Sequence, residues 1–178
     1  LSKHEAVTNC ISFFNRMAEE NLDHVAAIQQ AQASTVPNAD RIQNLIKLCR
    51  EYGNELRSGS VVLTDFSLLQ REALTLIQGN PAANRVFRHV IVDEYQDTNT
   101  IQELLFFALA GGHHNICVVG DDDQALYRFR GATVENFVRF PQRCQQYLAV
   151  EPKTIPLNEN YRSRGKIVEF YNQFMKQC

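Results

Sequence analysis

The sequence predicts an α/β fold in which helices flank a parallel sheet, with an all-helical lobe at the N-terminal end. In the first third of the chain apolar residues recur only at helical spacing, whereas short β-branched segments alternate with helix-period segments in the rest. Strand, helix, strand, helix order with fully apolar strands is typical of a parallel sheet that helices cover on both faces. We therefore divide the chain into a helical lobe, residues 1–63, and an α/β region, residues 64–178.

The helical lobe has two apolar stripes at i, i+3, i+4, i+7 spacing. The first runs over residues 3–20 and continues more weakly to about residue 33, and the second runs over residues 42–52. Pro37-Asn38 separates them, and Ser58-Gly59-Ser60 ends the lobe. No residue pattern in this lobe indicates catalysis, so we interpret it as amphipathic helix packing.

The α/β region contains three apolar segments that predict strands and three that predict helices. The strands are expected over residues 86–92, 116–119 and 154–157, the last near a sheet edge because Pro156 cannot donate a backbone hydrogen bond. The helices are expected over residues 66–77, 101–109 and 167–175, with Thr64 and Ser163 as candidate caps of the first and the last. In such sheets a ligand lies at the carboxyl ends of the strands.

Composition restricts the class of protein. The net charge of −2 argues against a broadly basic nucleic-acid-binding surface, so any DNA contact would depend on a few placed arginines and aromatic residues. No window approaches about 18 consecutive apolar residues, so no membrane span is expected. The five cysteines are widely spaced without a C-x-x-C pair, which favours reduced thiols in a cytoplasmic protein. The first residue is not methionine, and we interpret the start as a cut within a longer chain.

The first chemically suggestive segment is Val90-Ile-Val-Asp93-Glu94-Tyr95-Gln96-Asp97. Two adjacent carboxylates at the end of a buried strand suit phosphoryl transfer, because one can hold Mg²⁺ while the next orients and deprotonates an attacking water. The alternative is that Asp93 only caps a turn and Glu94 is solvated. This short pattern is common, and by itself it leaves both interpretations open.

The second segment, Gly120 to Ala132, joins three consecutive acids to an alternation of aromatic residues and arginines. Three acids cannot belong to a regular buried strand, because unpaired carboxylates are costly to desolvate, but beside a magnesium-nucleotide they would face a cation. Aromatic side chains stack on bases of single-stranded nucleic acid, and arginines hold its phosphates. A turn followed by core aromatics and solvated arginines is the alternative.

The third segment is Asn158-Glu-Asn-Tyr161-Arg162-Ser163-Arg164. Its position, from a strand end to a helix start, would let the Arg162 guanidinium clamp a terminal phosphate. Alone, the segment fits an ordinary capped helix with surface arginines equally well.

In this order the three segments resemble motifs II, III and IV of the UvrD/Rep/PcrA family of superfamily 1 DNA helicases. The resemblance extends from about Asp65 to Phe174, and the long second segment is its most specific part. It implies an incomplete RecA-like sheet, with residues 1–63 as part of a helical insert. It also implies a cytoplasmic, ATP- and Mg²⁺-dependent helicase of DNA repair, which translocates 3′→5′ on single-stranded DNA and unwinds duplex at junctions.

The resemblance assigns five residues to the nucleotide. Asp93 would coordinate Mg²⁺ and Glu94 would be the catalytic base, with Gln124 sensing the γ-phosphate as part of the catalytic group. Tyr161 would stack near the adenine, and Arg162 would contact the γ-phosphate.

The resemblance assigns three more residues to DNA. Tyr127 and Phe129 would stack on single-stranded DNA, and Arg130 would bridge towards the nucleotide. Many family members have tryptophan at the position of Phe129. Phenylalanine keeps an aromatic face for stacking, but a smaller one. Gln96 and Asp97 would belong to the network between the motifs.

The sequence departs from the family in one serious respect. No G-x-x-x-x-G-K-[S/T] loop is present, and the only Gly-Lys pair, Gly165-Lys166, is followed by Ile167. That loop supplies much of the grip on a triphosphate. We therefore expect either a fragment of a helicase that is inert alone, which we favour, or a stand-alone DNA-binding or regulatory module without ATPase activity.

Overall fold

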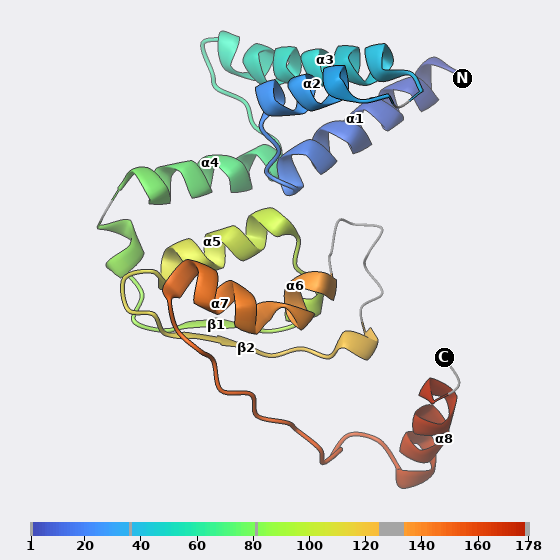
Figure 1. The fold of residues 1–178 in the computed structure, drawn as a ribbon, viewed down its shortest axis with the longest axis vertical. Coiled ribbons are helices and arrows are strands. Elements are labelled where there is room, and N and C mark those ends of the chain that lie inside the picture. The colour runs from blue at the N-terminus through green and yellow to red at the C-terminus, as the bar shows by residue number, and fades with distance from the viewer. Residues whose placement is uncertain (1, 36, 81, 125–133, 177–178) are drawn as a thin grey trace.

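The computed structural model describes residues 2–35, 37–80, 82–124 and 134–176. Three N-terminal helices form a lobe at the top of Figure 1, a fourth helix leads down to a two-stranded sheet with its helices, and an extended segment leads to the last helix. The predicted α/β fold with a helical N-terminal part is confirmed. Tyr127, Phe129 and Arg130 lie outside the described residues.

The N-terminal lobe consists of α1 (Lys3–Glu19), α2 (His24–Ala33) and α3 (Ala39–Ser58). Its core is a small cluster of buried side chains, Met17, Ile46 and Cys49, against which Phe14 and Ile28 pack. The apolar stripes of the sequence thus face one another, as helical periodicity predicts.

Helix α4 (Phe66–Gly79) connects the lobe to the sheet region, with contacts to both α1 and α5. Its N-cap is Asp65, whose Oδ1 accepts a hydrogen bond from the backbone N of Leu68 at 2.8 Å. The expected cap, Thr64, was therefore wrong by one residue. A carboxylate is an acceptor as suitable as a hydroxyl at this position, and Asp65 also accepts a hydrogen bond from the Tyr52 hydroxyl at 3.1 Å.

The sheet has two parallel strands, β1 (Val90–Val92) and β2 (Ile116–Val118), in the described part of the chain. Val90 lies opposite Ile116, and Val92 lies opposite Val118. The parallel pairing is as predicted, but β1 is shorter than the expected 86–92. The chain before it instead forms the 3₁₀ turn η1 (Ala83–Arg85) and an irregular link.

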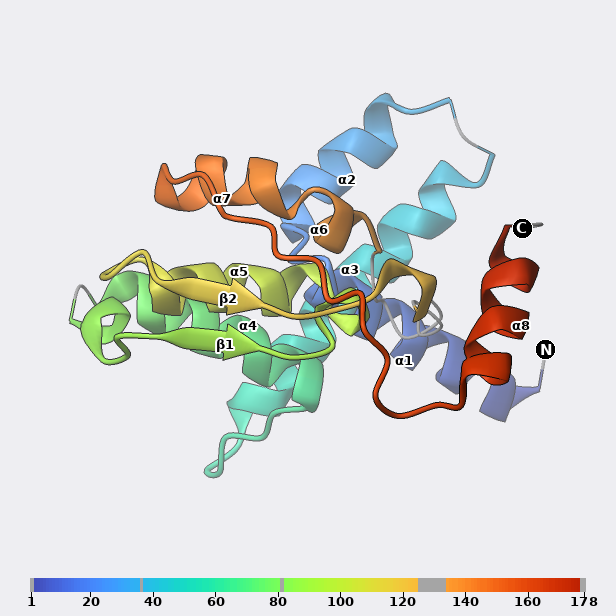
Figure 2. The same cartoon turned by 90° about the horizontal axis from the view of Figure 1, so that it is seen from below.

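In the described part of the chain, helices cover only one face of this sheet, which corrects the expectation of cover on both. Val90, Val92, Ile116 and Val118 pack against a core from α5 (Thr100–Ala110) and α7 (Phe140–Leu148). On the other face Ile91 is 74% exposed and Cys117 is exposed as well. Figure 2 shows the strands in front of α5 and α4 from that open side.

Two helices, α6 (Val134–Val138) and α7, were not predicted from the sequence. The signal for α7 was the spacing of Phe140, Cys144 and Leu148, which are four residues apart and all buried. This i, i+4, i+8 pattern is a helical stripe, and Pro141 stands in the first turn, where proline is favoured.

The predicted strand over residues 154–157 was wrong. These residues are irregular, with Ile155 68% exposed and Leu157 83% exposed. A strand needs a neighbour to complete its backbone hydrogen bonds, and the described chain offers none beside this segment. Helix α8 (Gly165–Met175) follows, and its N-cap is Arg164 without a side-chain bond, not Ser163. No helix in the described residues has the length and apolar character to span a membrane.

Candidate active site

The carboxyl ends of β1 and β2 lie side by side and carry the polar residues that the sequence singled out. Asp93 and Glu94 follow β1 directly, and both are exposed. The backbone N of Tyr95 donates to the carbonyl of Val119 at 2.9 Å, which ties the turn after β1 to the end of β2. Both strand ends therefore present their side chains at one edge of the sheet.

Glu94 has a backbone conformation that is uncommon for its residue type. Its φ of 51° lies in the left-handed region, which non-glycine residues enter at a free-energy cost. The Asp93 carboxylate stabilises the turn, since its Oδ1 accepts from the backbone N of Glu94 at 3.0 Å. This left-handed conformation turns the chain directly after β1, where the two adjacent carboxylates of Asp93 and Glu94 lie.

Gln96 connects the two strand ends through both ends of its amide. Its side chain is buried, with 1% of its surface exposed. Its Nε2 donates to Glu94 Oε2 at 2.7 Å, and its Oε1 accepts from the backbone N of Asp121 at 3.1 Å. The amide therefore orients the Glu94 carboxylate and fixes the turn after β2 in relation to it.

The turn after β2 contains Asp121, Asp122, Asp123 and Gln124, of which the last three form the 3₁₀ turn η3 (Asp122–Gln124). Asp121 organises this turn, because its Oδ1 accepts from the backbone N of Asp123 at 3.1 Å and its Oδ2 from Gln124 Nε2 at 2.6 Å. Gln124 is the last residue of η3, and its side chain is exposed.

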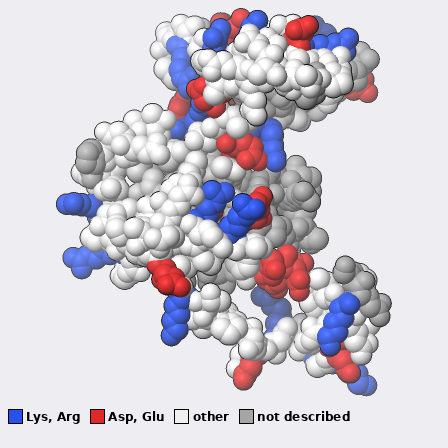
Figure 3. Space-filling view, viewed as in Figure 1, with Lys and Arg blue, Asp and Glu red and all other residues white. Residues whose placement is uncertain are grey.

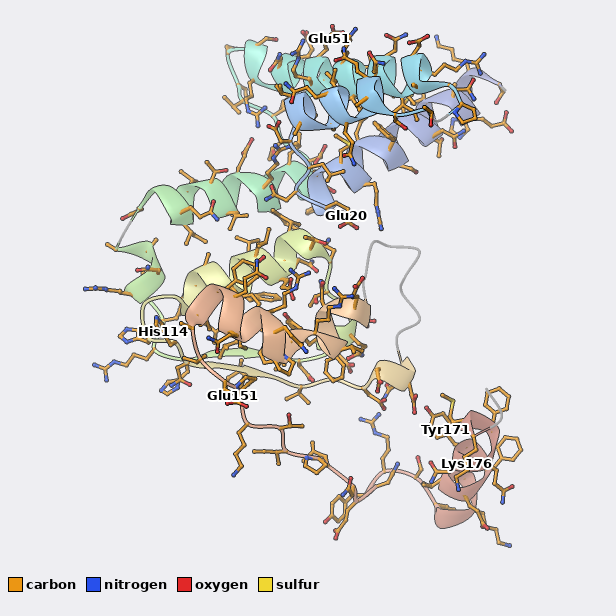
Figure 4. All side chains as sticks on the ribbon, viewed as in Figure 1. Glu20, Glu51, His114, Glu151, Tyr171 and Lys176 are labelled. Carbon is orange, nitrogen blue, oxygen red and sulfur yellow. The ribbon has the colours of Figure 1, made fainter. Side chains whose placement is uncertain are left out.

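Helix α8 lies close to this acidic turn through Tyr171, which Figure 4 labels. Desolvation, followed by the charge of Asp123 and Asp121, raises the pKa of the Tyr171 phenol. The acidic side chains of the turn thus have a neutral hydroxyl as a neighbour.

Gly120 allows the two strand ends to approach closely. A Cβ at this position would lie 2.6 Å from Gln96 Oε1 and 2.9 Å from Phe137 Cε2. Phe137 is on α6, so the glycine marks the point where α6, the Gln96 amide and the turn after β2 meet. No side chain fits there without a shift of that arrangement.

Gly120→Ala is expected to lower the free energy of unfolding by about 1–3 kcal/mol, the usual cost of overpacking. Urea unfolding followed by circular dichroism measures it. Gly79→Ala is the matched control, because a Cβ at Gly79 has no neighbour within 4 Å. Equal unfolding midpoints for the two variants would show that the space around Gly120 is not restrictive.

Tyr161 and Arg162 occupy the exposed segment between α7 and α8. Asn160 Oδ1 accepts from the backbone N of Arg162 at 3.0 Å and of Ser163 at 2.8 Å, which makes a local turn. Tyr161 is 90% exposed, and its hydroxyl donates to Glu159. Within the described residues no hydrogen bond or ion pair joins Tyr161 or Arg162 to the strand-end carboxylates, so their roles stay predictions.

A buried polar cluster beneath the site was missed from the sequence. The Tyr95 hydroxyl donates to Glu103 Oε1 at 3.1 Å, and Arg143 Nε lies 3.4 Å from Glu103 Oε2. Burial raises the pKa of Glu103, and Arg143 only partly offsets this. Burial, with the Glu103 charge, also raises the pKa of the Cys144 thiol to about 11. The signal was the helical spacing of Glu103 with Phe107 and Ala110, both buried.

Acidic and basic side chains are interspersed over the face shown in Figure 3, on the helical lobe and on the sheet region alike. Together with the paired carboxylates at the strand ends, this describes a parallel α/β protein whose polar site lies at the carboxyl edge of its sheet. Sites of this class bind their ligand outside the strand ends.

Within that class, the chain belongs to the UvrD/REP helicase family. Residues 2–145 match the family model described as the UvrD/REP helicase N-terminal domain. This confirms the family resemblance, and the matched residues include the first two motif segments.

Several curated relatives are DNA helicases. The chain is 36% identical over 155 residues to the ATP-dependent DNA helicase UvrD1 of Mycobacterium tuberculosis, covering 80% of this chain and 19% of that protein. It is 33% identical over 165 residues to the ATP-dependent DNA helicase PcrA of Bacillus subtilis, covering 91% and 20%. It is 38% identical over 118 residues to the ATP-dependent DNA helicase PcrA of Staphylococcus epidermidis, covering 65% and 15%. The chain thus spans a fifth or less of the length of these relatives.

Proposed function

We propose that this chain is part of an ATP-dependent DNA helicase and contributes the carboxylates that serve ATP hydrolysis. The observation that carries the proposal is the Asp93-Glu94 pair at the end of β1, which Gln96 joins to the acidic turn after β2. Paired carboxylates at a strand end suit phosphoryl transfer. The relatives are named ATP-dependent DNA helicases, which supports ATP as the nucleotide.

Glu94 acts in this proposal as the base that orients and deprotonates the attacking water. Its carboxylate is exposed, and the Gln96 amide holds one oxygen and leaves the other free to accept a proton. Gln124 senses the γ-phosphate from the turn after β2, and Arg162 contacts it from the exposed segment after α7. Tyr161 stacks near the adenine.

Asp93 fits the role of the Mg²⁺ ligand. Its carboxylate is exposed beside Glu94, and Mg²⁺ is usually held by one or two carboxylates together with substrate phosphates and water. When bound, the ion would neutralise negative charge on the phosphates. The residues of this chain then hold the nucleotide and its attacking water in line.

The DNA contacts in this proposal come from Tyr127, Phe129 and Arg130, which follow the acidic turn in the sequence. Tyr127 and Phe129 stack on bases of single-stranded DNA, and Arg130 bridges towards the nucleotide. Translocation is 3′→5′, with unwinding at duplex junctions. The cellular setting is DNA repair in the cytoplasm. Gln124 lies five positions before Phe129 in the sequence, so one short segment touches both ligands and can couple them.

We also propose that the 178-residue chain alone does not hydrolyse ATP. Its sequence contains no G-x-x-x-x-G-K-[S/T] loop, and binding of a triphosphate would depend on Asp93, Gln124 and Arg162 without a cradle of backbone amides. A DNA-stimulated turnover that disappears in Glu94→Gln would contradict this.

Phe129→Ala tests the DNA part of the proposal. The change removes an aromatic face but no charge, so it should weaken binding of a single-stranded oligonucleotide by about 1–3 kcal/mol. The salt dependence of binding should not change, because no phosphate contact is lost. Fluorescence anisotropy measures both. Phe66→Ala is the control, since Phe66 is 86% exposed on α4. Equal affinities for the two variants would remove Phe129 from the DNA site.

A further inference from the structure

A second cavity lies away from the strand ends, between α1, α3 and α4. It has a volume of about 580 Å³ and is lined by charged and aromatic side chains from all three helices, together with His24 at the start of α2. We call it the arginine pocket, after Arg50, Arg57 and Arg71, which line it. None of the three helicase-like motifs contributes to it.

The carboxylates around the arginine pocket already have partners. Asp65 caps α4 and accepts from the Tyr52 hydroxyl. Glu72 pairs with Arg57 at 2.5 Å. Just outside the lining, Asp23 caps α2 by accepting from the backbone N of Ala26 at 2.8 Å. These acids are therefore held in place by other groups.

Arg50 and Arg71 form no contact ion pair, although Arg71 lies near enough to Asp23 to help the backbone N–H of Ala26 lower the pKa of that carboxyl. Among the described residues, no carboxylate lies within ion-pair distance of either guanidinium. Arg71 is half-buried and Arg50 is exposed at the rim. Burial, then Arg71, lowers the pKa of His24, with a smaller contribution from Arg50 in the same direction and an opposing one from Asp23. The lining carries the three arginines against two carboxylates, Asp65 and Glu72, so positive charge is in excess there.

The rest of the lining is aromatic and apolar. The rings of Phe14 and Tyr52 are stacked, with their centroids 5.3 Å apart, and Leu68 and Leu76 of α4 also line the pocket. A guanidinium binds phosphate oxygens in a fork geometry, and an aromatic ring offers a face to a base. Arginines without a contact ion pair and aromatic rings that line the same pocket match the alternating chemistry of a nucleic-acid strand.

We propose that the arginine pocket binds the phosphodiester backbone of a single DNA strand through Arg50 and Arg71, as a contact separate from residues 125–133. The inference rests on the proposed function, because it takes DNA as the ligand of this chain. Arg50 comes from the helical lobe and Arg71 from α4, so a strand in the pocket would bind the lobe and the sheet region together.

The first test is binding of a fluorescein-labelled single-stranded oligonucleotide to the 178-residue chain over a range of salt concentrations. Arg50→Gln/Arg71→Gln should weaken binding roughly tenfold or more and reduce the slope of log affinity against log salt by about 1.4, since each phosphate contact on a single strand contributes about 0.7. The double variant Arg41→Gln/Arg88→Gln removes the same charge from exposed positions outside the pocket and should keep the wild-type slope.

The outcomes separate this inference from the proposed function. If Phe129→Ala weakens binding while the Arg50/Arg71 variant keeps the wild-type slope, the pocket is not a DNA site and the proposed function stands. If the wild-type chain binds no oligonucleotide, the inference fails, whereas the role of Asp93 and Glu94 in ATP hydrolysis is tested separately by Glu94→Gln. If the Arg50/Arg71 variant reduces the slope of log affinity against log salt and Phe129→Ala does not weaken binding, the inference stands. The stacking role of Phe129 then fails.

The second test measures the pKa of His24, a side chain that lines the pocket. A phosphate near Arg71 and Arg50 offsets their charge, so saturating oligonucleotide should raise the pKa of His24 in an NMR titration, while the resonances of His89, outside the pocket, stay unchanged. An unchanged His24 would contradict the proposal. A rise of the His24 pKa with ATP but not with oligonucleotide would assign the pocket to a free nucleotide and would overturn it.

Discussion

Glu94→Gln is expected to lower the DNA-stimulated ATP hydrolysis of a full-length helicase that contains this chain by about 10²–10⁴-fold, the usual contribution of a general base. Glutamine has the shape of glutamate but cannot accept a proton at neutral pH. The Gln96 amide can still donate to the Oε1 of a glutamine, as it donates to Glu94 Oε2 at 2.7 Å. The fold should therefore remain while the chemistry is lost.

Steady-state kinetics separates this interpretation from a structural effect. A group that acts only in the transition state should change kcat with little effect on KM for ATP. Glu151→Gln, at an exposed position in the segment after α7, is the matched control and should keep wild-type kcat. Retention of more than about half of the wild-type kcat in Glu94→Gln would assign the base to another residue and leave Glu94 as a turn residue.

Arg143→Met is expected to lower the free energy of unfolding by about 3 kcal/mol at pH 7.5, because it leaves Glu103 without its cation. Glu103 is fully buried, and Arg143 Nε lies 3.4 Å from its Oε2. Methionine keeps much of the volume of the arginine stem, so the loss should come mainly from the unpaired charge.

The effect of Arg143→Met should depend on pH in a defined direction. Burial raises the folded-state pKa of Glu103 above its ordinary value of 4.5, so the folded state holds the proton more tightly than the unfolded state. The contribution of Glu103 to the free energy of unfolding is fully present below pH 4.5, and it is lost as the pH rises through the folded-state pKa of Glu103. Removal of Arg143 raises that pKa further, so the variant should lose less stability at pH 5 than at pH 7.5.

Urea unfolding at the two pH values measures this dependence. Glu103→Gln in the Arg143→Met background should restore much of the stability at pH 7.5, because it removes the buried charge. Arg139→Met is the matched control, since Arg139 pairs with Glu135 at the surface and such pairs contribute about 0–1 kcal/mol. An equal loss at both pH values would point to packing of the arginine stem instead of charge.

The sequence predicted best where the physical signal is local. The stripes of α1 and α3 and the apolar segments of β1 and β2 identify their own secondary structure, since each depends on the spacing of a few neighbours. The order strand, helix, strand also predicted the parallel pairing, because a helical crossover between two paired strands requires it.

Errors arose where distant residues decide the outcome. Residues 154–157 have the composition of a strand, but Leu157 stays 83% exposed because a strand forms only beside a partner. Burial of Glu103 depends on Tyr95 and Arg143, which approach it only in the folded chain. Of the candidate site, the sequence predicted Asp93 and Glu94 at a strand end, and the resemblance placed Gln96 in a network between the motifs, but neither predicted which atoms the Gln96 amide joins.

That bridge gives the contact between the two strand ends a polarity. The amide of Gln96 has a donor at one end and an acceptor at the other, and each faces its complement, the Glu94 carboxylate and the backbone N–H of Asp121. A half-turn of the amide would put oxygen against oxygen and N–H against N–H, so both bonds would be lost together. Intermediate arrangements keep neither bond at good geometry. Rotation of this one amide therefore affects both partners, the carboxylate of Glu94 and the turn of Asp121, at the same time.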